Sequence, residues 1–348
     1  MNKVIHVFAD TPHHYHPMQQ FFSHQCKPSC EQAFWVKSAA PLNGFTNYEN
    51  NDELFALLNN VDKNAQVVFH GLFDMHTWKK LLFNPIVKRS SCVLWGGELY
   101  RHTKADRTIK QRIVHGLHAL LINRFKQVFA LNQGDAQLAQ KVFKRKHVAV
   151  LPYPLIGMQV AKSDCTQTDD LQPVKILVGN SASPSNNHID ALNKLAHLAD
   201  DNIEIIMPLN YAGEPEYVEQ VINHANSLFK NKVTAITSML SKAQYDALLN
   251  EVSMTVFAQQ RQQGLYVAYA MLLMGRPLFL LGSTSSYTNL SALGFKLHKT
   301  DSLADISFNE LTNLTNEFNR NNANLMQQHF TEAALAPKWR TMLQNLHA

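Results

Sequence analysis

Residues 175–198, KILVGNSASPSNNHIDALNKLAHL, decide the fold of this chain. The run Val174–Val178 is apolar and partly β-branched, which suits a buried strand of a parallel sheet. Gly179 and the small polar residues after it predict a sharp turn, and Ser185 or Asn186 is the expected N-cap of a helix. Apolar residues then recur at helical spacing: Ile189, Leu192, Leu195 and Leu198.

The loop of this strand–loop–helix unit is a candidate site for a diphosphate. A helix N-terminus presents unpaired backbone N–H groups and a partial positive charge to whatever lies before it. The loop is not a P-loop, because no Gly-Lys-Ser/Thr follows, and its glycine spacing differs from the dinucleotide-binding fingerprint. An ordinary strand-to-helix turn is the alternative.

Strands and helices alternate throughout, which predicts an α/β fold with parallel sheets. The polar segment Ala161–Pro173 has the composition of a linker. We therefore expect Rossmann-like domains over residues 1–160 and 174–325, and a C-terminal helix over 326–348 that can pack back on the first domain. A long helix is expected from about Thr103 to Arg124. The expected strands lie near Val4–Phe8, Phe34–Val36, Val67–His70, Cys92–Trp95, Val128–Leu131, Val148–Leu151, Lys175–Val178, Glu204–Met207, Val233–Ile236, Thr255–Phe257 and Leu278–Leu281.

The 348 residues suffice for two domains, and the first residues lead into a strand without the features of a signal peptide. No apolar run reaches transmembrane length, because Gly275-Arg276-Pro277 interrupts Leu265–Leu281. The four cysteines form no disulfide framework, and the spacing of Cys26 and Cys30 is a poor match to a zinc site. We expect free thiols in a reducing cytoplasm and no metal.

Positive charge concentrates in residues 88–147, which hold thirteen basic and three acidic side chains. Because the whole chain has a net charge of +5, the remainder is net negative. Such a region favours an anionic partner, either a membrane surface or a polyphosphate, and a solvated helical face is the alternative. Nucleic acid is not expected, because no aromatic residues interleave with the basic ones and no nucleic-acid fold signature occurs.

Polar residues just after the strands are the candidates for chemistry, because parallel sheets bind ligands outside the carboxyl ends of their strands. In the first half, Asp10 and Glu98 are the carboxylates best placed to take a proton from an acceptor hydroxyl. Asp10 could instead cap the next turn, and Glu98 could pair with Arg101. A satisfied buried imidazole is the alternative for His70. The further candidates on this acceptor side are His13, His14, His70, Gly71 and Tyr100.

In the second half, the polar run Gln259–Gly264 precedes an apolar helix, Leu265–Met274. Arg261 supplies positive charge and the glutamines supply hydrogen bonds, which suits a nucleotide diphosphate at a helix N-terminus. A polar surface loop is the alternative. Pro208 and Tyr211 follow another expected strand, where an aromatic ring can stack on a base.

Two Rossmann-like halves joined by one linker correspond to the GT-B arrangement of glycosyltransferases, in which the carboxyl ends of both sheets face one cleft. The sequence has no Asp-x-Asp, the motif that usually holds a metal in the other large glycosyltransferase architecture. Most of the chain resembles the TDP-N-acetylfucosamine:lipid II N-acetylfucosaminyltransferases of enterobacterial common antigen assembly. The motifs that carry the resemblance are Asp10–His14, Phe69–Gly71, Trp95-Gly96, Glu98–Tyr100, Gly134-Asp135, Leu177–Ser181, Ser185-Asn186-x-His188 and Arg261–Gly264.

The resemblance implies a metal-independent enzyme without cofactor, bound peripherally to the cytoplasmic face of the inner membrane. Its donor would be TDP-4-acetamido-4,6-dideoxygalactose, and its acceptor an undecaprenyl-diphosphate disaccharide. The family has Asp at the position of Glu98, and the helix after Gly264 lacks the glutamate of many retaining GT-B enzymes, so inversion is expected. The candidate donor residues are Gly179, Asn180, Ser181, Asn186, His188, Pro208, Tyr211, Arg261, Gln262, Gln263 and Gly264.

Two other functions remain open from the sequence. One is a GT-B transferase that uses another nucleotide sugar and another glycolipid, which competition among free nucleotides would distinguish. The other is a non-catalytic protein that binds nucleotide sugars or polyanions, for which salt-dependent binding without sugar transfer would be the sign.

Overall fold

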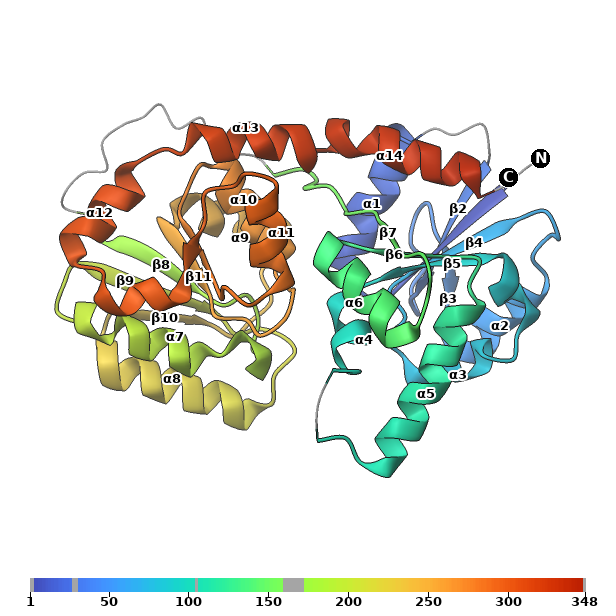
Figure 1. Cartoon of the computed structure of the whole chain (residues 1–348), viewed down its shortest axis with the longest axis horizontal. Coiled ribbons are helices and arrows are strands. Elements are labelled where there is room, and N and C mark those ends of the chain that lie inside the picture. The colour runs from blue at the N-terminus through green and yellow to red at the C-terminus, as the bar shows by residue number, and fades with distance from the viewer. Residues whose placement is uncertain (1–2, 27–30, 104–105, 159–171, 347–348) are drawn as a thin grey trace. The chain divides into compact units, whose positions relative to one another are not determined.

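The computed structural model describes residues 3–26, 31–103, 106–158 and 172–346. The chain divides into two compact units (Figure 1). Unit 1 comprises Met1–Ile156 and Thr331–Ala348, and unit 2 comprises Gly157–Phe330. Residues 161–171 of the predicted linker, which include Cys165, lie outside the described residues. The same is true of Cys30 and Lys104.

Unit 1 is built on a seven-stranded parallel sheet with the strand order β3-β2-β1-β4-β5-β6-β7. The chain runs from β1 outward to β3 on one side and from β4 outward to β7 on the other. The order therefore reverses between β1 and β4, which is where an open α/β sheet has its ligand crevice. The strands are β1 Lys3–Phe8, β2 Glu31–Lys37, β3 Thr46–Tyr48, β4 Gln66–His70, β5 Ser90–Leu94, β6 Gln127–Ala130 and β7 Ala149–Val150.

All six strands expected in this half are present, and the three-residue β3, too short to show a pattern, was not predicted. The long helix expected from Thr103 begins only at Ile109, because Thr108 and Gln111 form a capping box there. The helices of unit 1 are α1 Pro12–His24, α2 Asn51–Asn59, α3 Met75–Leu81, α4 Gly96–Tyr100, α5 Ile109–Arg124, α6 Gln133–Phe143 and α14 Glu332–Asn345, with the 3-10 helix η1 Pro85–Arg89.

The C-terminal helix α14 is part of unit 1 through a buried aromatic contact. The Trp339 ring stacks on Tyr153 with 5.5 Å between the ring centroids. The Trp339 indole N–H donates to the Pro152 carbonyl at 3.0 Å. The segment expected as one helix over 326–348 is divided, because α13 ends at His329 in unit 2 and α14 starts at Glu332.

Unit 2 has a six-stranded parallel sheet with the order β10-β9-β8-β11-β12-β13, so its order reverses between β8 and β11. With unit 1, this confirms the predicted α/β class with two parallel sheets. The strands are β8 Val174–Val178, β9 Ile203–Pro208, β10 Val233–Ile236, β11 Met254–Phe257, β12 Leu278–Leu280 and β13 His298–Lys299. The helices are α7 His188–Leu195, α8 Pro215–Phe229, α9 Lys242–Glu251, α10 Leu265–Leu273, α11 Ser285–Ala292, α12 Phe308–Asn316 and α13 Arg320–His329, with 3-10 helices η2 Pro184–Asn186, η3 Ala196–Leu198 and η4 Thr300–Asp305.

The deciding stretch forms β8, a loop and α7 as predicted, but its helix cap was predicted wrongly. Ser185 and Asn186 belong to η2, and Asn187, in the left-handed conformation with φ 55°, stands at the N-cap position without a side-chain cap. Asn186 turns inward instead and is almost fully buried. The apolar residues at helical spacing pack into the core of unit 2 as expected, with Ile189 half-buried.

Candidate functional site

The loops at the switch point of unit 2 are bonded to each other. The Gln259 Nε2 atom donates to Asn180 Oδ1 at 2.7 Å and to Asn186 Oδ1 at 3.1 Å. The Ser185 hydroxyl donates to Gln263 Oε1 at 3.0 Å. The loop after β8 and the loop after β11 therefore form one polar structure.

Two glycines in these loops are required by the backbone. Gly179 has φ 72°, and a Cβ atom there would lie 2.5 Å from His188 Nε2. Gly264 has φ 66°, and a Cβ there would lie 2.9 Å from the Phe257 ring. Any larger residue at either position meets both left-handed strain and a close contact.

The start of α10 has polar groups that a ligand can satisfy. Gln262 Oε1 and Gln263 Nε2 are buried and have no hydrogen-bond partner among the described residues. The helices α7 and α10, which follow the two switch-point strands, both begin without a side-chain cap. A buried polar atom without a partner costs about 1–3 kcal/mol, and the first N–H groups of a helix favour an anion. Gln263 Nε2 and these N–H groups are donors and suit a diphosphate, whereas Gln262 Oε1 is an acceptor and suits a hydroxyl or N–H group of a ligand.

Tyr211 and Arg261 lie at the same end of the sheet. The Tyr211 hydroxyl accepts a hydrogen bond from Asn180 Nδ2 at 2.9 Å. Burial raises the pKa of Tyr211, and hydrogen bonds from Asn180 and Ser181 and the positive charge of Arg261 oppose that rise. Tyr211 also lines an open hollow of about 450 Å³ between the end of β9 and α8. Its exposed ring is thus available to stack on a base.

Four predicted donor residues make contacts inside unit 2, and their contact with a donor stays a prediction. Pro208 is the buried last residue of β9, paired with β10, and does not follow the strand as expected. Asn186 Nδ2 donates to the carbonyl of Ser181, so both residues hold the loop in shape. The His188 Nδ1 atom lies 3.0 Å from the Tyr217 hydroxyl, and burial lowers the pKa of His188 to about 4. The second ring nitrogen of His188, Nε2, is buried without a hydrogen-bond partner among the described residues.

At the switch point of unit 1, Asp10 is exposed directly after β1. It makes no hydrogen bond to a described residue, and neither it nor Thr11, the N-cap of α1, caps that helix with its side chain. Its negative charge adds to burial in raising the pKa of Tyr15 and Tyr48, so the carboxylate lies near both rings. Among the described residues, Asp10 therefore does not cap the turn after β1, which was the alternative considered for it.

Glu98, in contrast, is fully buried, and both of its carboxylate oxygens accept hydrogen bonds. Its Oε1 atom accepts from the Leu72 backbone N–H at 2.6 Å, and its Oε2 atom from the Trp95 N–H at 2.8 Å. Burial raises the pKa of Glu98 to about 7, with these N–H groups and Arg101 opposing the rise. Glu98 ties the loop after β4 to the loop after β5.

His70 belongs to a buried hydrogen-bond chain. Its Nε2 atom lies 2.9 Å from His6 Nδ1, and its Nδ1 atom lies 2.8 Å from the Tyr153 hydroxyl. His6 continues the chain to Gln32 Oε1 at 3.1 Å. Both ring nitrogens of His70 are thus paired in the interior, and burial lowers its pKa. The predicted ligand contact of His70 gives way to the alternative, a satisfied buried imidazole.

The remaining acceptor-side candidates also divide into residues with contacts inside the protein and residues that stay available to an acceptor. Tyr100 donates its hydroxyl to Asp135 Oδ1 at 2.7 Å and thereby joins α4 to α6. Gly71 has a φ of 79°, in the left-handed region. A Cβ atom added at this position would lie 2.8 Å from the Phe73 ring, so the glycine leaves room for that ring. His13 is exposed, and the two ring nitrogens of His14 are buried without partners among the described residues. Only the two neighbouring histidines therefore stay near Asp10 as candidates for the acceptor.

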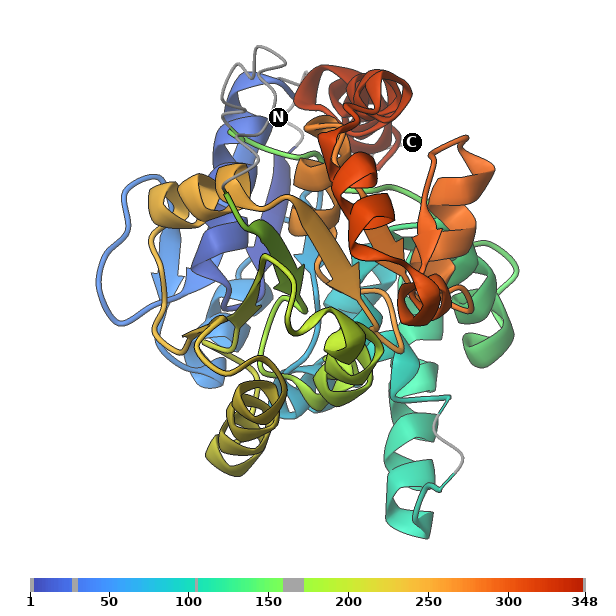
Figure 2. The same ribbon diagram turned by 90° about the vertical axis from the view of Figure 1, so that its left-hand side faces the viewer.

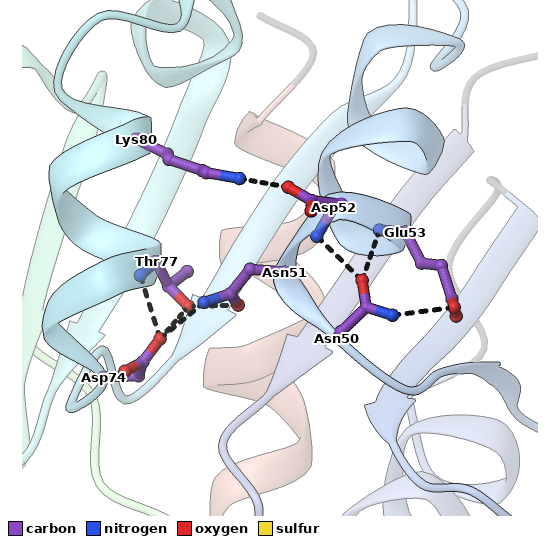
Figure 3. A network of polar contacts seen from close by, with 7 residues as sticks. All are labelled: Asn50, Asn51, Asp52, Glu53, Asp74, Thr77 and Lys80. Carbon is purple, nitrogen blue, oxygen red and sulfur yellow. Dashed lines mark hydrogen bonds and ion pairs between the residues drawn. The ribbon is translucent and has the colours of Figure 1, made fainter.

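A carboxylate that sequence reasoning missed, Asp74, caps α3 at the same edge of the sheet (Figure 3). It accepts from Asn51 Nδ2 at 2.9 Å and from the Thr77 hydroxyl at 2.6 Å. Burial opposes its ionisation, but these hydrogen bonds prevail and lower the pKa of Asp74 to about 2. Like Asp10, it raises the pKa of Tyr48. Its signal in the sequence was an Asp soon after a strand, at the start of a helix.

Within the described residues, no group of three or more His, Cys, Asp or Glu side chains has the arrangement of a metal site. Of the helices in these same residues, none has the length and apolar character needed to cross a membrane.

Two parallel-sheet units with polar loops at their switch points are typical of the GT-B fold, and solved structures share this fold. Sucrose-phosphate synthase from Thermosynechococcus elongatus matches with a TM-score of 0.69 at 13% identity, covering 99% of each chain. UDP-forming trehalose-phosphate synthase from Burkholderia xenovorans matches with a TM-score of 0.67 at 9% identity, covering 100% of each. A glycosyltransferase from Rickettsia africae matches with a TM-score of 0.65 at 12% identity, covering 99% of this chain and 98% of the other.

Residues 1–345 match the family described as 4-alpha-L-fucosyltransferase glycosyl transferase group 56. The chain belongs to this family and is a glycosyltransferase. The predicted fold, the enzyme class and the family resemblance are thereby confirmed.

Proposed function

We propose that this enzyme transfers 4-acetamido-4,6-dideoxygalactose from its TDP-sugar to an undecaprenyl-diphosphate-linked disaccharide. The family description names a fucosyltransferase, and fucose is likewise a 6-deoxygalactose. The observation that carries the proposal is the buried, unpartnered amide donor of Gln263 beside Arg261, at the uncapped start of α10.

Unit 2 would hold the donor. The diphosphate would accept hydrogen bonds from the first N–H groups of α10 and a charged pair from Arg261. The base would stack on Tyr211. As the sugar–phosphate bond breaks, these groups would stabilise the negative charge that develops on the leaving TDP, without a metal.

Asp10 would act as the general base on the acceptor. The acceptor oxygen attacks the anomeric carbon, its proton passes to the carboxylate, and the anomeric C–O bond breaks with its electron pair on TDP. Direct displacement inverts the configuration at that carbon. Asp10 is preferred to Glu98 because it is exposed and unoccupied by hydrogen bonds from described residues, whereas both oxygens of Glu98 accept backbone N–H groups.

The acceptor would reach the enzyme at the cytoplasmic face of the inner membrane. Not all of the basic residues between 88 and 147 are available for this, because Arg89 and Arg145 donate to backbone carbonyls and Lys126 donates to Leu346 O. Lys88, Lys110 and Arg112 are exposed and can meet anionic headgroups.

Calorimetric titration of the purified protein with TDP, UDP, GDP and ADP, without metal, tests the donor. We expect TDP to bind most tightly, and a transfer assay with a polyprenyl-diphosphate acceptor then tests the reaction. Tighter binding of UDP or GDP would retain a glycosyltransferase and reject the TDP-sugar. Binding of none of the four would reject the diphosphate site at α10.

A further inference from the structure

The helix α5 has apolar residues on two opposite faces. One face packs into the core of unit 1 through Leu121 and Ile122, which are fully buried. The other face is open and carries Ile109, Ile113, Leu117 and Leu120, with exposed fractions of 79%, 60%, 38% and 54%. A surface helix needs only its inner face to be apolar, so the outer stripe calls for a second partner.

The spacing places these four side chains in one row. Steps of four, four and three residues keep successive side chains on the same face of a helix. At 100° per residue the row spans about 80° of the helix circumference. Figures 1 and 2 both show the N-terminal half of α5 projecting beyond the neighbouring helices of unit 1. The row therefore lies where a flat surface can reach it.

The charges beside this row identify the kind of surface. Lys110 borders it on one side and Arg112 on the other, and both are exposed. No acidic residue occurs between Ile109 and Arg124. An apolar stripe flanked by Lys and Arg, without acids, is the pattern of helices that lie in the interface of an anionic bilayer. A protein partner would not require the flanking charge to be of one sign.

We infer that α5 docks the enzyme on an anionic lipid surface by inserting Ile109, Ile113, Leu117 and Leu120 among the lipids while Lys110 and Arg112 contact their headgroups. The inference rests on the proposed function, since a lipid-linked acceptor gives this docking its purpose. Apolar burial gives the depth of binding, and the charges give the preference for anionic lipid.

Insertion is tested first with a fluorescent residue in the row. Every tryptophan of the chain is buried or half-buried, so Ile113→Trp adds an exposed fluorophore. Met239→Trp, at a position 62% exposed in unit 2, is the matched control. With vesicles of phosphatidylglycerol, phosphatidylethanolamine and brominated lipid, we expect strong quenching of the added tryptophan at 113 and little at 239. Equal quenching of the two would overturn the inference.

Loss of binding is tested by sedimentation with the same vesicles. We expect the double variant Ile113→Asp/Leu120→Asp to bind at least about tenfold more weakly, because two of the four apolar contacts are replaced by negative charge. Lys110→Ala/Arg112→Ala should bind anionic vesicles about tenfold more weakly and phosphatidylcholine vesicles unchanged. Met239→Asp is the control that keeps wild-type binding.

Titration with TDP separates this inference from the proposed function. The α5 variants tested for vesicle binding should bind TDP as the wild type does, because the proposed donor residues lie in unit 2. Vesicle binding unchanged in Ile113→Asp/Leu120→Asp would overturn the docking role and leave the donor proposal standing. A wild-type dimer that ignores vesicles and dissociates in this variant would assign the row to a second copy of the chain instead.

Discussion

The two switch points have the same strand topology and present opposite charges. Between β1 and β4, unit 1 exposes the carboxylate of Asp10, while His6 and His70 pair with each other in the interior. Between β8 and β11, unit 2 presents Arg261 and the unpartnered amides of Gln262 and Gln263. A shared fold therefore fixes where a ligand can bind, and the loops after the strands fix which ligand it is.

The largest expected effect is that of Asp10→Asn. If unit 1 supplies the base, the rate of sugar transfer should fall about 10²–10⁴-fold while TDP affinity stays unchanged. Asp52→Asn, which removes an exposed carboxylate paired with Lys80 (Figure 3), should change the rate less than about twofold. Steady-state kinetics and calorimetry measure both, and an active Asp10→Asn enzyme would exclude Asp10 as the base.

The comparison also predicts that unit 1 is the more sensitive to acid. A histidine whose folded pKa is depressed keeps its stabilising effect above its unfolded pKa and loses it as pH falls. From pH 7.5 to 5.5, each such buried histidine costs about 1.4 kcal/mol. Burial lowers the pKa of six histidines in unit 1 and of two in unit 2: His6, His13, His14, His70, His102 and His118, against His188 and His298.

Glu98 acts in the opposite direction. Because burial raises its folded pKa to about 7, its protonation adds about 2 kcal/mol of stability over the same interval. Because the described residues of unit 1 include four more histidines with a depressed pKa than those of unit 2, and only Glu98 opposes them, unit 1 remains the more destabilised of the two at low pH. Hydrogen exchange at pH 7.5 and 5.5, resolved by peptide, measures this difference. If the lower pH accelerated hydrogen exchange equally in the peptides around β4 and β8, the prediction would be contradicted.

Gly179→Ala tests whether the loop after β8 can accommodate a Cβ atom at its left-handed position. The left-handed backbone and the contact with His188 should together cost about 2–3 kcal/mol of stability. Gly116→Ala is the matched control, because nothing lies within 4 Å of an added Cβ there. In the middle of α5 that change should stabilise by about 0.5–1 kcal/mol. Thermal unfolding compares the two, and similar melting temperatures would show that the loop adapts.

Arg261→Ala should weaken donor binding and also slow transfer, because the proposed role of Arg261 includes stabilising the leaving TDP. We expect TDP affinity to fall about 10–100-fold, with Arg261→Lys intermediate because it retains the charge and loses the fork of donors. Gln260→Ala, an exposed change in the same loop, should stay within about twofold. Unchanged TDP affinity in Arg261→Ala, measured by calorimetry, would remove Arg261 from the donor site.

Much of the fold was predictable because it depends on local patterns. Short apolar runs followed by Gly and small polar residues identified both switch-point loops, and helical spacing identified α7. The helix cap was misplaced, because Asn186 and Ser185 could each cap a helix and only the surrounding loop decides which residue turns inward. The strand β3 was missed because three residues carry no periodicity.

The sequence by itself determined two α/β halves, the strand ends that carry polar residues, and the basic character of residues 88–147. Tertiary structure alone decided which of these polar residues are available. Glu98 follows a strand as Asp10 does, and His70 ends one, yet neighbouring strands and helices bury both and pair their atoms. The same holds for α5, whose outer row is exposed because none of the described elements of unit 1 covers it. Burial depends on contacts between distant segments, and no local pattern encodes those contacts.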